Sequence, residues 1–143
     1  MSGRGLAPAA VVAIVLAFPA ASPGATFRGA AVDDPQTTVT LRVSKAGVVR
    51  FDYADVMVKC SNGDEIREPG AEHSTMLGEK RRFKDVIAQD LGEDTTGESF
   101  IRGRLRGRRA AGILRYGLVY EGGSCESGKV HWKARHKKSA RGG

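Results

Sequence analysis

Apolar and polar residues alternate along several short stretches of this chain, which is the pattern of half-buried β-strands. Residues 37–43 alternate Val39, Leu41 and Val43 with polar side chains, and residues 49–53 repeat the pattern after a short turn. Because side chains on a strand point alternately to its two faces, each stretch would bury one face and expose the other. The two stretches therefore predict an antiparallel hairpin.

The phase of the alternation changes directly afterwards. Val56, Val58 and Cys60 lie at even positions. A bulge or break near Ala54–Asp55 would account for the shift, because one extra residue moves every later side chain to the other face. Cys60 is then expected to point into the core at the end of a strand. Residues 61–70 are polar and rich in turn-forming residues, which predicts a loop.

The clearest pattern is the pair of runs at 99–106 and 112–120, which surround a glycine-containing turn. Two alternating runs around such a turn predict a hairpin. In the first run the apolar face carries Ile101, Gly103 and Leu105. The opposite face carries Arg102, Arg104 and Arg106.

Residues 79–91 are ambiguous. Phe83, Val86, Ile87 and Leu91 have helical spacing, but no good N-cap precedes them. The stretch therefore fits either a short helix or a strand.

The terminal sequence "SCESGKVHWKARH" alternates again, with Val130, Trp132 and Ala134 on one face. This predicts a final strand in which Trp132 is a core anchor close to Cys125. Short strands separated by loops at these intervals are typical of an antiparallel β-sandwich or a small β-barrel. We expect the β domain to cover residues 37–135, after a lead-in at 26–36.

The two ends of the chain have other signals. Residues 1–25 combine one cation, an apolar run of ten residues and a small-residue zone, which is the pattern of a secretory signal peptide. Cleavage is expected after Gly24 or Ala25. The run is shorter than the ~20 residues that a spanning helix needs, so no stable membrane insertion is expected after cleavage. Residues 136–143 are basic and aperiodic, which predicts a disordered tail.

The chain has two cysteines, Cys60 and Cys125. In an exported protein an even cysteine pair predicts a disulfide, with two separate buried thiols as the alternative. A bridge would enclose 64 residues. Closing a loop of that length stabilises the fold by ~4 kcal/mol in the chain-entropy model. Neither cysteine belongs to a C-x-x-C motif, so the spacing for redox catalysis or for a zinc site is missing.

Charge is unevenly distributed. Residues 26–100 carry ten Lys and Arg against fourteen Asp and Glu, whereas residues 101–143 carry twelve against two. The arginine row is a candidate polyanion-binding surface, because alternate residues on a strand lie ~6.6–6.8 Å apart. The candidate residues are Arg102, Arg104, Arg106, Arg108, Arg109 and Arg115. Alternatively, the arginines simply cover an exposed sheet face.

Catalytic and metal signatures are weak. The G-x-S-x-G motif is missing, and a Ser-His-Asp set built on His73, His131 or His136 has no spacing to support it. No metal-ligand spacing stands out. We therefore expect no enzyme activity, no cofactor and no metal. No aromatic residues interleave the arginines to stack on bases, so specific nucleic-acid recognition is not expected either.

The late "FIRGRL…AGIL" hairpin and the ending "CESGKVHWKAR" resemble a group of small secreted all-β proteins from high-GC Gram-positive bacteria. Their last strand reads roughly C-x-[ST]-G-x-V-x-W-x-A-x-R. Cys125, Ser127, Gly128, Val130, Trp132 and Ala134 occupy that pattern here, whereas its final arginine position falls on His136 and Arg135 precedes it by one residue. The resemblance implies an exported all-β domain with one disulfide, and it brings no catalytic residues.

Together these patterns predict an exported or envelope-associated, non-enzymatic β domain. Its basic sheet face would bind an anionic cell-envelope polymer or polysaccharide. A structural or accessory envelope domain with a protein partner is the alternative, and a hydrolase without a recognisable motif comes third.

Overall fold

A computed structural model describes residues 24–136 of the chain, and this part is almost entirely antiparallel β-strand. The predicted all-β fold with one disulfide is confirmed. The strands are β1 (Ala25–Ala31), β2 (Thr38–Val43), β3 (Val48–Ala54), β4 (Val56–Cys60), β5 (Glu65–Glu68), β6 (Ala71–Met76), β7 (Arg82–Gly92), β8 (Thr95–Arg106), β9 (Arg109–Tyr120), β10 (Gly123–Glu126) and β11 (Val130–His136).

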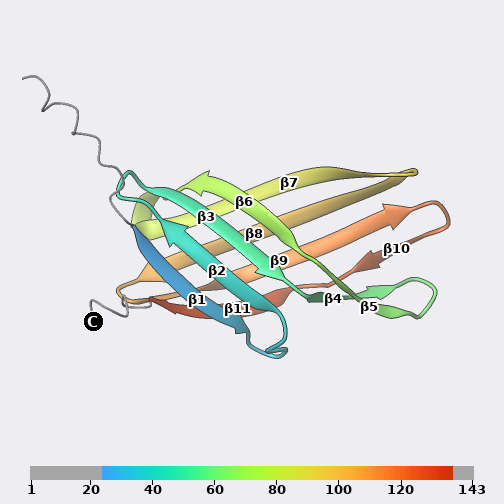
Figure 1. Ribbon diagram of the computed structural model, residues 1–143, viewed down its shortest axis with the longest axis horizontal. Coiled ribbons are helices and arrows are strands. Elements are labelled where there is room, and N and C mark those ends of the chain that lie inside the picture. The colour runs from blue at the N-terminus through green and yellow to red at the C-terminus, as the bar shows by residue number, and fades with distance from the viewer. Residues whose placement is uncertain (1–23, 137–143) are drawn as a thin grey trace, which may run out of the picture.

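All the strands belong to one sheet. Its main order is β5-β4-β10-β9-β11-β1-β2-β3-β6, and β8 pairs with both β9 and β7. Strand β9 has two partners on the same side, because its first half pairs with β11 and its second half with β10. The sheet curls so that β1, β2, β3 and β6 cross in front of β7, β8 and β9 (Figure 1). The result is a curled, partly closed barrel with one interior.

The barrel closes at the seam between β6 and β7. No backbone ladder joins these two strands in the described part of the chain. The Gly78 backbone N–H donates to the carbonyl oxygen of Arg82 at 2.7 Å, and the Thr75 hydroxyl donates to the carbonyl oxygen of Lys84 at 3.1 Å. Side chains therefore contribute much of the closure.

The interior is packed around Trp132, which is 1% exposed. Its ring centroid lies 5.0 Å from that of Phe51 and 6.3 Å from that of Phe83. A Cβ atom added to Gly103 would lie 2.6 Å from Phe83 and 2.7 Å from Trp132, and one on Gly112 would lie 2.8 Å from Trp132. The two glycines on β8 and β9 therefore make room for the indole ring.

The sequence led us to expect Trp132 beside the disulfide, but the structure places it elsewhere. On β9 it faces Gly112, whereas Cys125 faces Leu118. The two residues contact opposite halves of the same long strand. Aromatic rings and glycines surround the indole instead.

Residues 82–91 belong to a strand, so of the two interpretations of the stretch 79–91 the strand is right and the helix carrying the apolar stripe is wrong. A three-residue 3-10 turn, Glu79–Arg81, leads into β7. Phe83 is buried, but Val86 and Leu91 are 55% and 46% exposed, so the helical stripe does not form one buried face. Pairing with β8 provides a backbone ladder for nearly the whole of β7.

Two other expectations about boundaries need correction. The lead-in at 26–36 contains most of β1, which lies inside the sheet between β11 and β2. The loop at 61–70 contains β5, so the chain makes a further hairpin there. The predicted break is present, because Asp55 has a φ of 59° between β3 and β4. Residues 1–23 and 137–143 lie outside the described part of the chain, and with them most of the predicted signal peptide and of the predicted tail.

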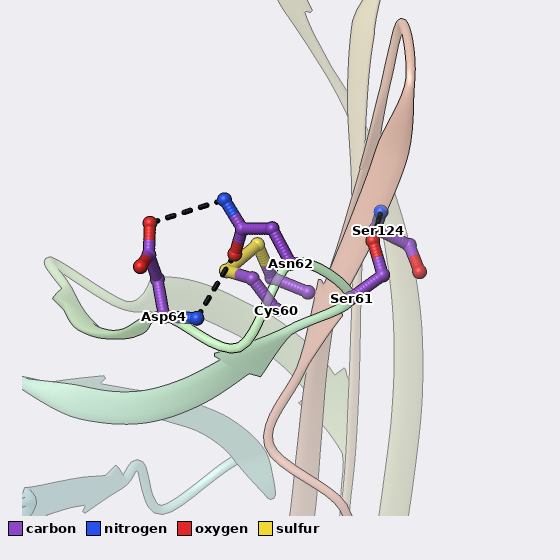
Figure 2. Close-up of a disulfide and its surroundings, with 6 residues drawn as sticks. Cys60, Ser61, Asn62, Asp64 and Ser124 are labelled. Carbon is purple, nitrogen blue, oxygen red and sulfur yellow. Dashed lines mark hydrogen bonds between the residues drawn. A yellow bond between two sulfur atoms is a disulfide. The ribbon is translucent and has the colours of Figure 1, made fainter.

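The disulfide joins β4 to β10 (Figure 2). Cys60 and Cys125 face each other in the ladder, with an S–S length of 2.04 Å. The turn after Cys60 is held by Gly63, whose N–H donates to the Cys60 carbonyl oxygen at 2.9 Å. The Ser124 N–H donates to the Ser61 hydroxyl at 3.1 Å, so the two strands are also joined beside the bridge. No helix in residues 24–136 is long and apolar enough to cross a membrane.

Replacing Gly103 with alanine should destabilise the protein, because the new methyl group overlaps Phe83 and Trp132. Overpacking of this kind costs about 1–3 kcal/mol in the free energy of unfolding, measurable by urea denaturation. Gly117→Ala is the matched control, since its Cβ would meet nothing nearer than 3.6 Å. Equal stability of the Gly103→Ala variant and the wild type would show that the interior has spare room.

Candidate functional site

Outward-facing cations gather on four adjacent strands, β8, β9, β11 and β1. They border a shallow groove of about 1150 Å³. We call this surface the basic groove; its cations are Arg28, Arg102, Arg104, Arg106, Arg109, Lys133 and Arg135. The alternation of each strand explains the arrangement, because inward residues such as Leu105 and Trp132 are buried while their neighbours face solvent.

Strand register places these cations directly opposite one another. Arg106 faces Arg109, Arg109 faces Arg135, and Arg135 faces Arg28. Like charges in directly opposed positions destabilise a sheet. The basic groove thus concentrates mutual repulsion that an ordinary sheet surface would avoid by alternating the signs of its charges.

Two more pairs of like charge extend the row onto the next strand. On β7, Arg82 faces Arg104 and Lys84 faces Arg102.

Arg42 and Arg50 also face each other, on β2 and β3, but Asp52 lies within the electrostatic range of Arg42. Burial raises the pKa of Asp52, and the nearby Arg42 and Arg28 partly oppose that rise. Beyond the groove, Asp52 on β3 faces Glu72 on β6, so carboxylates are present on that part of the sheet.

No carboxylate balances the groove from within. Among residues 24–136 the Lys and Arg ion pairs are Lys59–Glu65 and Arg67–Asp34, and neither involves a cation of the basic groove. The floor between the cationic rows is apolar, formed by Ala111, Gly112 and Ile113 on β9. Ile113 is only 7% exposed although it points outward, and its register partners on the two neighbouring strands are Arg102 and His131.

The six candidate arginines do not all lie together. Arg102, Arg104, Arg106 and Arg109 line the basic groove. Arg108 is exposed in the turn between β8 and β9. Arg115 lies in a second groove of about 980 Å³ on β7–β10, where Glu98 and Glu126 are also present.

Three cations of the groove were missed by sequence reasoning. Lys133 and Arg135 were assigned to the solvent face of a closing strand, and Arg28 was placed in the lead-in. Strand β9 lies between β11 and β8, so Lys133 and Arg135 are not directly opposite the arginine row on β8. The alternation in "KVHWKAR" was a usable signal for the first two. Nothing local marked Arg28, because its position depends on β1 pairing with β11.

A second feature lies inside the barrel, where four polar side chains form a hydrogen-bonded chain. The His73 Nδ1 atom lies 2.9 Å from a carboxylate oxygen of Asp85, and its Nε2 atom lies 2.7 Å from the Ser99 hydroxyl. Ser99 is also hydrogen-bonded to the Tyr53 hydroxyl. The residues come from β3, β6, β7 and β8, so the chain crosses the seam between β6 and β7.

One set of donors and acceptors satisfies the whole buried chain. Asp85 accepts from Nδ1–H of a neutral His73, Nε2 accepts from the Ser99 hydroxyl, and Ser99 accepts from Tyr53. Burial lowers the pKa of His73, and the hydrogen bond and charge of Asp85 offset this only in part. Burial likewise raises the pKa of Tyr53, so its phenol stays protonated.

The order of Asp85, His73 and Ser99 is that of an acid, a base and a nucleophile in acyl transfer. Sequence reasoning named His73 for such a set but could not choose its partners. The Ser99 side chain is 0% exposed, however, and a nucleophile must meet its substrate. In this conformation the chain links the strands of the seam, and the hydroxyl of Ser99 and the ring of His73 are closed off from solvent, whereas the Asp85 side chain is 24% exposed.

Metal ligands do not gather in the described part of the chain. No group of three or more His, Cys, Asp or Glu residues within 24–136 is arranged to hold an ion. The acidic loop between β7 and β8 carries Asp90, Glu93 and Asp94, but these do not form such a group.

Comparison with known proteins adds little to this geometry. No protein-family model matches the chain, and no curated protein does. The solved structure of a rhizavidin–biotin complex resembles it with a TM-score of 0.41 and 11% sequence identity, covering 85% of this chain and 98% of that one. At this level of similarity, the ligand of that protein is not transferred to this chain.

The buried His73 should make the fold sensitive to acid. Because its pKa is lowered in the folded state, the unfolded chain takes up the proton more readily. Stability should be fully present above pH ~6.5, the unfolded pKa, and should fall below it by at most about 1.4 kcal/mol per pH unit. Urea unfolding between pH 5 and 7.5 measures this slope.

His73→Gln should flatten that slope, whereas His131→Gln, which removes an exposed imidazole, should leave it unchanged. If His73→Gln does not fold, carbon–proton NMR of the wild-type imidazoles gives the answer directly. A His73 resonance that titrates at or above the ordinary histidine pKa would contradict the prediction.

Proposed function

We propose that this protein is an exported, non-enzymatic domain that binds an anionic polymer through the basic groove. The supporting observation is that arginines occupy directly opposed positions on neighbouring strands. Arg106, Arg109, Arg135 and Arg28 lie side by side on four strands without a carboxylate among them. Such repulsion is relieved when a polyanion neutralises the surface and its counterions are released.

Export is part of the same proposal. The signal-like pattern of residues 1–25 and the Cys60–Cys125 bridge both suit an oxidising compartment outside the cytoplasm. An envelope location would bring the basic groove next to anionic wall polymers and acidic polysaccharides. The "CESGKVHWKAR" ending resembles small secreted all-β proteins from high-GC Gram-positive bacteria. Membership of this chain in that group agrees with an envelope location and is part of the proposal.

Ester hydrolysis is a second candidate, favoured by the Asp85–His73–Ser99 chain. Burial of Ser99 weighs against it, since an acyl substrate has no path to the hydroxyl. We therefore expect a fluorophosphonate probe not to label the folded protein. Mass spectrometry that found the adduct on Ser99, lost in the His73→Gln variant, would favour the hydrolase instead.

Polymer binding is tested by retention on immobilised heparin, with elution by a salt gradient. The Arg102→Ser/Arg104→Ser/Arg106→Ser variant should elute at clearly lower salt. Its slope of log affinity against log salt should fall by about one for each charge contact that is lost. The fold should persist, because the three side chains face solvent on a long paired strand.

The matched control is Lys45→Ser/Lys59→Ser/Lys129→Ser, which removes the same net charge from outside the basic groove. Its elution should stay close to that of the wild type. If both triple variants elute together, binding follows net charge alone and the groove has no special role.

A further inference from the structure

The densest line of charge in the basic groove runs across the strands. Arg106, Arg109, Arg135 and Arg28 occupy directly opposed positions on β8, β9, β11 and β1. Neighbouring strands lie about 4.8 Å apart, so the four residues span roughly 14 Å. We call these four residues the transverse row.

The next line along the strands is sparser. Two residues further along each strand, Arg104 faces Ala111, Ala111 faces Lys133, and Lys133 faces Ala30. Cations and alanines alternate across β8, β9, β11 and β1, so two of these four strands contribute a charge, and Arg82 on β7 adds one beside Arg104. A ligand that neutralises the greatest repulsion would therefore follow the transverse row and not a single strand.

The transverse row has a defined end. Beyond Arg28 the same line continues to Thr40 on β2 and then to Asp52 on β3, where an anionic ligand would be repelled. The row also crosses the region where the sheet bends from β8 and β9 through β11 to β1 (Figure 1). A flexible single chain can follow this bend at little cost, whereas bending a double helix takes elastic energy.

The lining of the groove indicates what is recognised. Apart from its cations and two histidines, the groove is lined only by Gly, Ala, Val, Ile and Trp132. None of these lining residues has a hydroxyl, amide or carboxylate side chain that could bind sugar hydroxyls. The indole of Trp132 faces the core and is buried, so no exposed indole is present for stacking on a sugar or a base.

From these observations we propose that the ligand is a linear, flexible phosphate polymer, bound across the strands with successive phosphates on the transverse row. This rests on the function proposed above and specifies its ligand. Guanidinium groups suit phosphate because they donate two parallel hydrogen bonds to it. The small apolar floor lets the polymer lie close to the sheet. A hydroxyl-rich polymer would lose hydrogen bonds to water against such a floor, whereas a polyphosphate chain has few hydroxyl groups to lose them.

The experiment measures binding of inorganic phosphates of graded length by calorimetry at low salt. Orthophosphate and tripolyphosphate cannot reach all four arginines, so they should bind weakly. Affinity for each chain should rise steeply up to the length that spans the transverse row and then level off. Long-chain polyphosphate should bind more tightly than duplex DNA at equal phosphate concentration.

A pair of matched variants tests the direction of binding. Arg28→Ser/Arg135→Ser removes half of the transverse row and should weaken long-chain polyphosphate binding about tenfold or more, with little effect on tripolyphosphate. Lys84→Ser/Arg102→Ser removes an equal charge from opposed positions off that row, and should weaken long-chain binding much less.

The possible failures are distinguishable. If the protein is retained on heparin but binds polyphosphate of every length weakly, the ligand is not a phosphate polymer, and the proposal that the groove binds an anionic polymer survives. Equal losses in the two double variants would refute the transverse path alone. If neither heparin nor polyphosphate binds, the proposed function itself fails.

Discussion

The whole architecture depends on β11 lying between β9 and β1. The chain builds one antiparallel series from β1 to β3 and β6, and another from β7 to β9. These two series become a single sheet because β11 pairs with β9 on one side and with β1 on the other. Without that pairing, neither series would enclose an interior.

The same strand sets both faces of the sheet. Trp132 points inward and fills the space left by Gly103 and Gly112, while Lys133 and Arg135 point outward into the basic groove. Period-two alternation links the two outcomes, since a shift of one residue would bury the cations and expose the indole. The strand that completes the core therefore also completes the groove.

The electrostatic cost of the groove is compatible with a stable fold because other interactions offset it. Ile113 is buried beneath the groove, the disulfide joins β4 to β10, and the His73 hydrogen-bonded chain ties β6 to β7. The presence of several opposed like charges on such a scaffold is the reason for proposing a ligand for the groove. A sheet surface with no function would lose nothing by exchanging an arginine for a glutamate.

Much of the fold could be read from local pattern. Alternation identified the β8–β9 hairpin, the phase change at Asp55 and the inward side of Trp132, because strand geometry couples neighbouring residues in sequence. The helical alternative at 79–91 failed because spacing alone cannot show that β8 offers a ladder to β7. β1 was missed because "TFRGAA" alternates weakly and is stabilised by its two neighbours.

By itself, the sequence determined the all-β class, the single possible cysteine pairing and a row of arginines on one face of a strand. Only the tertiary structure decided which distant cations lie beside that row. Arg28 meets Arg135 through a strand pairing 107 residues apart in sequence, and Arg135 meets Arg109 through one 26 residues apart. It likewise decided that His73 meets Asp85 and Ser99. Non-local contacts of this kind depend on sheet register and curl, which no short stretch of residues encodes.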